Sequence, residues 1–196
     1  MTSYITPADL KASLSLEDQS YADQDVELAI AAASRGIDGM TGRRFYKDQD
    51  ANRIRYYTPT RHDTLHINDL VELTALRVDG EEWEEGDYRL LPLNAAADGH
   101  PYTTIIPVGR RRFPAGVVGG VEVVGRFGGP EVPDAVKAAT SILATKLLKR
   151  TREAPFGVVA FALDDGTAVR IARNDPDVRF LVDSYMRNQA RSVNLG

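Results

Sequence analysis

The chain has 196 residues, 43% of them apolar and 27% charged, which is the composition of one ordinary folded domain or of a domain with an appendage. The absence of cysteine excludes disulfides, thiol nucleophiles and thiolate metal sites, and three histidines are few for a histidine-rich metal centre. The net charge of −4 argues against a dedicated nucleic-acid binder. No apolar run approaches the ~18 residues that span a bilayer, and the N-terminus does not resemble a signal peptide, so we expect a cytoplasmic protein.

The front of the chain is predicted to be helical. Residues 6–9 (TPAD) have the pattern of a capping box, which opens a short helix to about Leu14. A longer helix is expected from Asp25, and Gly42 suits its left-handed C-terminal cap. Its apolar stripe at helical spacing consists of Val26, Ile30, Ala33, Ile37 and Met40.

Residues 53–127 change to a period of two and predict a small antiparallel β-module of five or six strands. Asp79-Gly80 is a strong hairpin signal. The last strand is expected to run to Phe127, whereas residues 94–100 and 109–116 are expected to be surface loops.

A second long helix is predicted from Pro133, with Val136, Thr140, Leu143 and Leu147 on its buried face. Because helical stripes before and after the β-module should pair, the module is expected to be an insertion. The predicted class is α+β: a small helical bundle with an inserted antiparallel β-module and an extended C-terminal arm that ends in a helix. The predicted domains are residues 1–152, with helices in 1–50 and 131–152 and the insertion at 53–127, followed by the arm at 153–196.

The arm contains two apolar features that need a surface to cover them. Residues 156–163 are a strand-like run, and residues 168–171 are expected to return as a second strand after a turn. Either the arm docks on a partner, by adding a strand to a sheet edge, or it folds back on its own domain as a hairpin and helix. The apolar residues of the run and the final helix are Phe156, Val158, Val159, Phe161, Leu163, Leu181, Val182, Tyr185 and Met186.

Several patterns could suggest chemistry, but each has a simpler explanation. Gly36, Gly39 and Gly42 lack the preceding strand and the following Lys-Ser/Thr of a phosphate-binding loop, so helix packing and a cap explain them better. His62 and His66 lack a third metal ligand at a suitable spacing. The four glutamates around Trp83 are expected to form a solvated, charged face.

Arg110, Arg111 and Arg112 form the densest basic cluster and could contact phosphate or an acidic partner, although such loops are also common on ordinary surfaces. No serine stands in a nucleophile motif. The sequence therefore predicts no catalytic residues, no cofactor and no metal, and we expect that the protein is not an enzyme.

Four segments, in this order, resemble the head–tail connector (adaptor) proteins of long-tailed bacteriophages. These segments are residues 4–10 (YITPADL), 37–45 (IDGMTGRRF), 78–88 (VDGEEWEEGDY) and 132–136 (VPDAV). The resemblance spans most of residues 1–152. The chain differs from the shortest members of the family in having a large β-module.

The resemblance implies a structural virion protein that forms a ring, typically twelvefold, beneath the portal. The ring would extend the DNA channel after packaging and seat the head–tail stopper or tail-completion protein. The implied partners are the portal protein, through the apolar arm residues given above, the tail-side protein, other copies of the chain, and packaged DNA without sequence specificity; no membrane is involved. The protein would reside at the head–tail interface of the virion, and in the host cytoplasm before assembly.

Two alternatives remain open at this stage. One is a stopper or tail-completion protein, which is usually shorter and dominated by a β-barrel. The other, of a different class, is a free-standing DNA-binding or regulatory domain with Arg110, Arg111 and Arg112 on the phosphate backbone.

Overall fold

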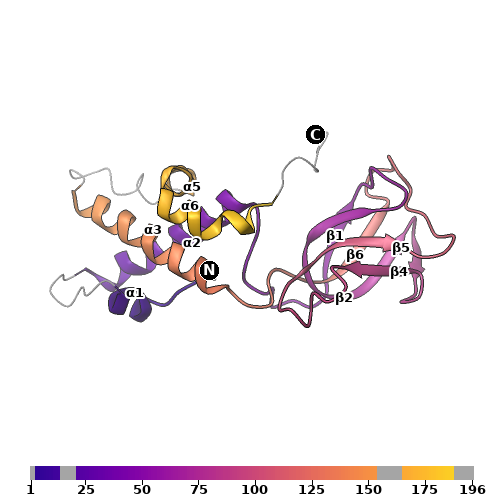
Figure 1. Cartoon of the computed structure of the whole chain (residues 1–196), viewed down its shortest axis with the longest axis horizontal. Helices are drawn as coiled ribbons and strands as arrows, with labels where there is room; N and C mark the ends of the chain where they lie inside the picture. Colours follow the sequence, from indigo (N-terminus) through magenta and orange to yellow (C-terminus); the bar gives the residue numbers. More distant parts are fainter. Residues whose placement is uncertain (1–2, 14–20, 154–164, 188–196) are drawn as a thin grey trace. The chain divides into compact units, whose positions relative to one another are not determined.

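The computed structural model of the chain describes residues 3–13, 21–153 and 165–187 (Figure 1). The chain folds into two compact units, which we call the helical unit (residues 1–43 and 132–196) and the β unit (residues 44–131). The described residues contain five α-helices and one six-stranded antiparallel sheet, so the prediction of a mixed α+β class is confirmed. None of the described helices is both long and apolar enough to cross a membrane.

Helix α1 (Pro7–Ser13) begins at the predicted capping box. The backbone N–H of Asp9 donates to Thr6 Oγ1 at 3.1 Å, and the backbone N–H of Thr6 donates to Asp9 Oδ2 at 3.0 Å. This reciprocal pair satisfies two helix-terminal donors. The hydrogen bonds from Thr6 also lower the pKa of Asp9.

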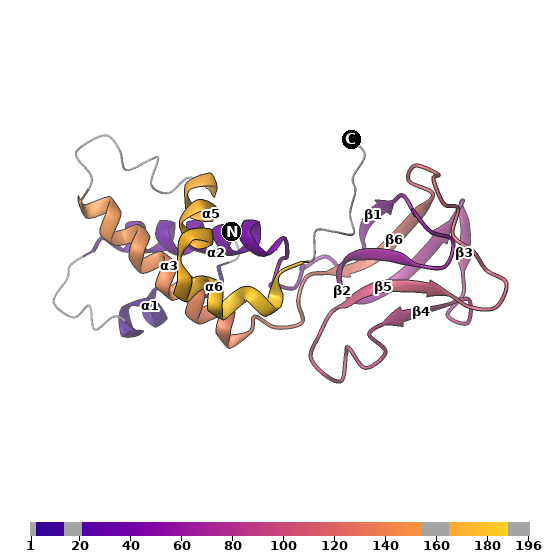
Figure 2. The ribbon, with the colours of Figure 1, turned by 45° about the horizontal axis from the view of Figure 1, so that its top comes forward.

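Helix α2 (Asp23–Thr41) is the central element of the helical unit (Figure 2). It ends at Gly42, which has a φ of 67° and whose N–H donates to Asp38 O at 2.8 Å, so the predicted left-handed cap is confirmed. The residues of the predicted stripe are all buried: Val26, Ile30, Ala33, Ile37 and Met40.

Helix α3 (Asp134–Glu153) packs against α2. The four residues predicted for its buried face, Val136, Thr140, Leu143 and Leu147, are fully buried. The Thr140 hydroxyl donates to Val136 O at 2.8 Å, which explains how a polar side chain is tolerated on this face.

The C-terminal part of the helical unit contains α5 (Asp165–Asn174), α6 (Pro176–Val182) and a short 3₁₀ turn, η2 (Asp183–Tyr185). Helix α5 contacts α2, and α6 contacts α3. The prediction of an extended arm is therefore wrong for residues 165–187, which fold back on their own unit.

The β unit consists of β1 (Arg53–Tyr57), β2 (Leu65–Val78), β3 (Glu81–Trp83), β4 (Tyr88–Leu91), β5 (Tyr102–Pro107) and β6 (Val121–Phe127). The strand order is β1-β6-β2-β5-β4, and β3 pairs with the end of β2. At the β2–β3 hairpin, Asp79 and Gly80 both have positive φ, 50° and 82°, as a two-residue turn of type I′ requires. The predicted hairpin is thus confirmed.

One face of the sheet carries the core of the β unit, which includes Leu70, Leu76, Ile105, Phe113 and Val121. The sequence pattern does not indicate a strand at β5 or at the first half of β2. In β5 only Ile105 is buried and its neighbours are half-buried, so the strand lacks the clear in–out alternation that reveals a strand.

The chain enters and leaves the β unit along two segments that lie in contact. A Cβ on Gly128 would come within 1.9 Å of Tyr46 O, and one on Gly129 within 2.8 Å of Phe45 O. The backbone N–H of Asp48 donates to Phe127 O at 2.9 Å. Only glycine, at Gly128 with a φ of 107°, permits this approach of the two segments.

Candidate functional site

The close packing of α5 on α2 depends on two glycines. A Cβ on Gly36 would lie 3.0 Å from Leu143 Cδ2 and 3.1 Å from the backbone carbonyl carbon of Ala168. A Cβ on Gly39 would lie 2.5 Å from Val169 Cγ2. The three-residue glycine spacing therefore serves helix packing, as the sequence suggested, and not a phosphate site.

Residues 168–171 form part of a helix, so the prediction of a returning strand is wrong. Ala168, Ile171 and Ala172 are buried at spacings of three and four, which is the period of a helix face against α2. The turn before this strand was predicted at residues 164–166, and its described residues, Asp165 and Gly166, are the first residues of α5. A short apolar run cannot by itself distinguish a strand from a helix segment.

Helix α6 is held by Asp175. One carboxylate oxygen of Asp175 accepts from the backbone N–H groups of Asp177 and Val178, at 3.1 and 3.2 Å, and the other accepts from Lys146 Nζ on α3. Burial by itself would raise the pKa of Asp175, but these hydrogen bonds outweigh burial and lower the pKa. The cap and the ion pair together anchor α6 on α3.

The residues predicted for a partner-binding arm fall into three groups. Five lie outside the described residues: Phe156, Val158, Val159, Phe161 and Leu163. Val182 is fully buried, so it belongs to the core of its own unit. Leu181, Tyr185 and Met186 are half-buried. On the described part of the final helix, the most exposed apolar residue is instead Phe180.

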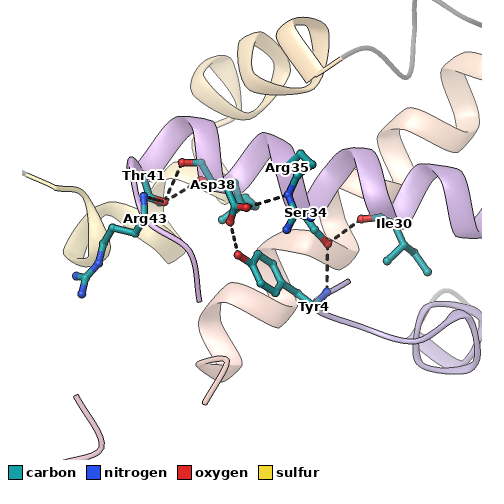
Figure 3. Close-up of polar contacts among 8 residues, drawn as sticks. Tyr4, Ile30, Ser34, Arg35, Asp38, Thr41 and Arg43 are labelled. Atoms are coloured by element: carbon teal, nitrogen blue, oxygen red, sulfur yellow. Dashed lines mark hydrogen bonds and ion pairs between the residues drawn. The ribbon is translucent and has the colours of Figure 1, made fainter. Parts of the chain in front are cut away.

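The N-terminal segment is fastened to α2 by a polar network (Figure 3). The backbone N–H of Tyr4 donates to Ser34 Oγ at 3.2 Å, and the Ser34 hydroxyl donates to Ile30 O at 2.8 Å. The Tyr4 hydroxyl donates to one oxygen of Asp38, while Arg35 Nε donates to the other at 2.8 Å. Each member has a structural partner, so the network positions the segment that precedes α1.

The three adjacent arginines occupy different environments. Arg111 donates to Glu81 Oε1 at 2.8 Å and to Asp87 Oδ2 at 3.0 Å, and its guanidinium lies 5.5 Å from the centre of the Trp83 ring. The hydrogen bond that Asp87 accepts from Arg111 lowers the pKa of Asp87. Arg111 is therefore committed to the structure of the β unit, and only Arg110 and Arg112 are exposed for contact with a phosphate or an acidic partner.

Arg111 also secures the aromatic pair beneath it. The rings of Trp83 and Phe113 stack with centroids 5.3 Å apart and an interplanar angle of 15°. His62 Nδ1 donates to Phe113 O at 2.8 Å and fixes the same loop from another side. The loop that carries the arginines is thus attached at three points.

A shallow hollow beside this loop has a volume of about 630 Å³ and is lined by Arg61, His62, Asp63, Ile106, Pro107 and Arg112. Arg61 forms two hydrogen bonds with Asp63, at 2.8 and 2.9 Å, which lower the pKa of Asp63 to about 2. Because Asp63 neutralises Arg61, the hollow has only a weak positive charge.

The histidines and acidic residues do not form a reactive centre in the described part of the chain. His62 contacts Phe113 O, as described above, and His66 Nδ1 lies 3.2 Å from Thr104 Oγ1. Glu81 and Glu82 are exposed, as predicted, and pair with Arg111 and Arg77. Among the described residues, no group of three or more His, Asp or Glu side chains could hold a metal ion.

The outer face of the sheet carries a row of polar side chains across four strands. Tyr56 on β1 stands opposite Glu122 on β6, Glu122 opposite Arg77 on β2, and Arg77 opposite Glu82 on β3. Arg77 forms ion pairs with both glutamates, and a hydrogen bond with Glu122 raises the pKa of Tyr56. This pairing keeps the β1–β6–β2 register fixed at its exposed face.

A surface that the sequence did not reveal lies at the β1 edge of the sheet. Four large apolar side chains are exposed there: Ile54 (51%), Tyr56 (65%), Val117 (46%) and Val118 (88%). We call these four residues the edge patch. The sequence shows two adjacent valines, Val117 and Val118, in a glycine-rich loop, but nothing in the sequence indicates that this loop lies beside β1.

No family model and no curated protein matches this chain. Its fold is similar to that of a chain from the neck of an empty gene transfer agent (GTA) particle computed with C6 symmetry, with 21% identity over 82% of this chain and 86% of that chain and a TM-score of 0.51. A chain from the neck of a native GTA particle computed with C12 symmetry is 22% identical over 83% of this chain and 90% of that chain, with a TM-score of 0.43.

Proposed function

We propose that this protein is a structural subunit of the neck of a phage-like particle, where identical copies form a ring between the portal and the tail. The observation that carries the proposal is the likeness of fold to a chain in the neck of a GTA particle, which covers more than four fifths of both chains. The resemblance of four sequence segments to head–tail connectors supports the same role.

Within the neck, we assign the protein the connector position rather than the stopper position. Stoppers are usually dominated by a β-barrel, whereas this chain has long paired helices, α2 and α3, which precede and follow its β unit in the sequence. The β unit is an open sheet with two edges. The proposed partners are the portal on the head side and a stopper or tail-completion protein on the tail side.

The ring would consist of many identical subunits around the DNA channel. The neck of the similar GTA particle was computed with C6 symmetry, and a twelvefold ring, as the connector resemblance implies, contains that symmetry. The acidic net charge of −4 suits a channel wall along which DNA slides without sequence-specific contacts. This role requires no catalytic residue.

The proposal is tested by deleting the coding sequence in the particle-producing cell. We expect DNA-filled heads and free tails that fail to join, and restoration of tailed particles when the wild-type chain is supplied. In wild-type particles, a tag on the chain should be seen by electron microscopy at the head–tail junction. Normal tailed particles without the protein would refute the assignment.

The DNA-binding alternative rests on Arg110 and Arg112 and is tested separately. A gel-shift titration of the full chain with duplex DNA at physiological salt should show no specific complex. Tight binding that is lost in the double variant Arg110→Gln and Arg112→Gln, but not in Arg89→Gln, would favour a free DNA-binding domain instead. Arg89 is a suitable control because it is an exposed arginine elsewhere on the same unit.

A further inference from the structure

The edge patch is a concentration of exposed apolar surface. Seven large apolar side chains are exposed among the described residues, and four of them form this patch. The loop with Val117 and Val118 is fixed beside β1, since Gly119 N–H donates to Thr58 Oγ1 at 3.1 Å and Gly116 N–H donates to Pro59 O at 2.8 Å. Exposed apolar surface gathered at one place marks an interaction site more often than scattered side chains do.

The patch flanks an open strand edge. Among the described strands, β1 pairs with β6 on one side and with no strand on the other. An open edge presents backbone N–H and C=O groups that an extended segment can bind as an added strand, while neighbouring pockets and apolar side chains select its sequence. The β1 edge therefore has both the hydrogen-bonding groups and the apolar contacts that strand addition needs.

The charged residues of β1 limit which segments could add to its edge as a strand. β1 carries two arginines and no acidic residue: Arg53 is exposed and pairs with Asp48 at 3.8 Å, and Arg55 lies 4.1 Å from the centre of the Phe127 ring. The positive charge of Arg55 disfavours a segment with basic residues, whereas an apolar segment followed by acids would fit. In this chain, residues 156–163 contain no charged residue, are rich in β-forming side chains, and are followed by Asp164 and Asp165.

We propose that residues 156–163 of one copy add as a strand to the β1 edge of a neighbouring copy and bury its edge patch. This inference rests on the proposed ring. In this proposal residues 156–163 bind a second copy of the chain and not the portal. Eight residues in a strand span about 26 Å, which is enough to cover the whole of β1.

The geometry of donor and acceptor suits a ring. The donor segment joins α3 to α5 in the helical unit, whereas the acceptor edge belongs to the β unit. Each copy thus has one donor segment and one acceptor edge, which belong to different units. Contacts of this head-to-tail kind close into rings when the rotation between copies permits, whereas reciprocal exchange between two copies would give a closed twofold dimer.

The absence of native cysteine makes a cross-linking test direct. The full-length chain with Tyr56→Cys is mixed at high concentration with differently tagged full-length chains that carry Val158→Cys, Val159→Cys, Ala160→Cys or Phe161→Cys, under mild oxidation. We expect disulfide-linked dimers of one tag with the other, with yields that alternate with a period of two along the run, because alternate side chains of a strand face the same way. The favoured positions should exceed the control at least tenfold.

The matched control is Leu93→Cys, since Leu93 is an equally exposed apolar residue (68%) that follows β4 at the other edge of the sheet. Equal yields at Leu93 and Tyr56, or yields without alternation, would overturn the proposal. So would a disulfide that forms only within single chains carrying both Tyr56→Cys and Val159→Cys.

A second measurement does not depend on the disulfide. Tyr56→Asp should abolish concentration-dependent self-association in sedimentation experiments, whereas Leu93→Asp should leave it unchanged, and circular dichroism verifies that both variants are folded. Self-association that survives Tyr56→Asp refutes the proposed contact. These experiments use the isolated chain, so their failure is distinguishable from failure of the neck assignment, which the deletion experiment tests in particles.

Discussion

Lys146, in the second half of α3, donates a hydrogen bond to the same carboxylate, that of Asp175, which caps the first turn of α6. Asp175 is almost fully buried, whereas Lys146 is half-exposed. The Asp175 side chain thus caps the N-terminus of α6 and also attaches α6 to α3.

Asp175→Ala should therefore lower the free energy of unfolding by about 1–2 kcal/mol, which is the usual cost of losing an N-cap. Asp175→Asn should cost less, because an amide oxygen still caps the helix. Chemical denaturation followed by circular dichroism measures both. The control is Lys137→Met, which breaks an exposed ion pair with Asp134 on the same helix and should change stability little.

The pH dependence of stability should reveal the same carboxylate. Because the pKa of Asp175 is lower in the folded chain than its ordinary value of 3.8, the folded state binds fewer protons there. Its stabilising contribution is complete above that ordinary value and is lost as the pH falls through the folded pKa. The difference in unfolding free energy between wild type and Asp175→Asn should thus be constant near neutral pH and shrink below about pH 3.8. A difference that grows on acidification would contradict this assignment.

Gly39 and Val169 provide a test of the close contact between α2 and α5. Gly39→Ala alone should destabilise the chain, because its new Cβ would meet Val169 Cγ2 at 2.5 Å. In the Val169→Ala background the obstruction is gone, and the same change should stabilise by about 0.5–1 kcal/mol through helix propensity. A double-mutant cycle should therefore give a coupling energy of about 0.5–3 kcal/mol. Additive effects would show that the contact is absent in solution.

Leu143 should be a core residue of the helical unit. It is fully buried on α3, and its Cδ2 atom would meet a Cβ placed on Gly36. Leu143→Ala is expected to lower the free energy of unfolding by about 2–5 kcal/mol. Lys149→Ala, at an exposed position on the same helix, is the comparison and should be nearly neutral. A neutral Leu143→Ala variant would place this face at an assembly surface instead.

Arg111 should differ from the arginines on either side of it. Arg111→Met removes two ion pairs and the guanidinium contact with Trp83, so the unfolding midpoint of the β unit should fall. Arg110→Met and Arg112→Met should have little effect. Trp83 is the sole tryptophan, and its intrinsic fluorescence reports this transition directly. Equal effects from all three substitutions would disprove the distinct structural role of Arg111.

Local signals in the sequence predicted the elements that such signals determine. The capping box at Thr6, the left-handed cap at Gly42, the Asp79-Gly80 turn and the buried stripe of α2 were all read correctly, because each depends on residues close in the chain. The fold of residues 165–187 was not predicted correctly. Helix α5 packs against Gly36 and Gly39 of α2, which are more than 120 residues away in sequence, so no local signal indicates this contact.

The candidate surfaces also could not be predicted from local signals in the sequence. Nothing in the sequence distinguished Arg111 from its neighbours, because its partners Glu81 and Asp87 lie 30 and 24 residues away. The edge patch brings β1 together with a loop some sixty residues later. Which arginine is available and which valines are exposed together are therefore results of the tertiary fold.

The contact between Phe45 and Gly129 brings together the two segments by which the chain enters and leaves the β unit. Both segments cross into the helical unit within three residues of this contact. The β unit can consequently lengthen, shrink or be exchanged without altering the register of α2 and α3. In a lineage of such chains, the helical unit and the appended sheet are free to evolve at different rates.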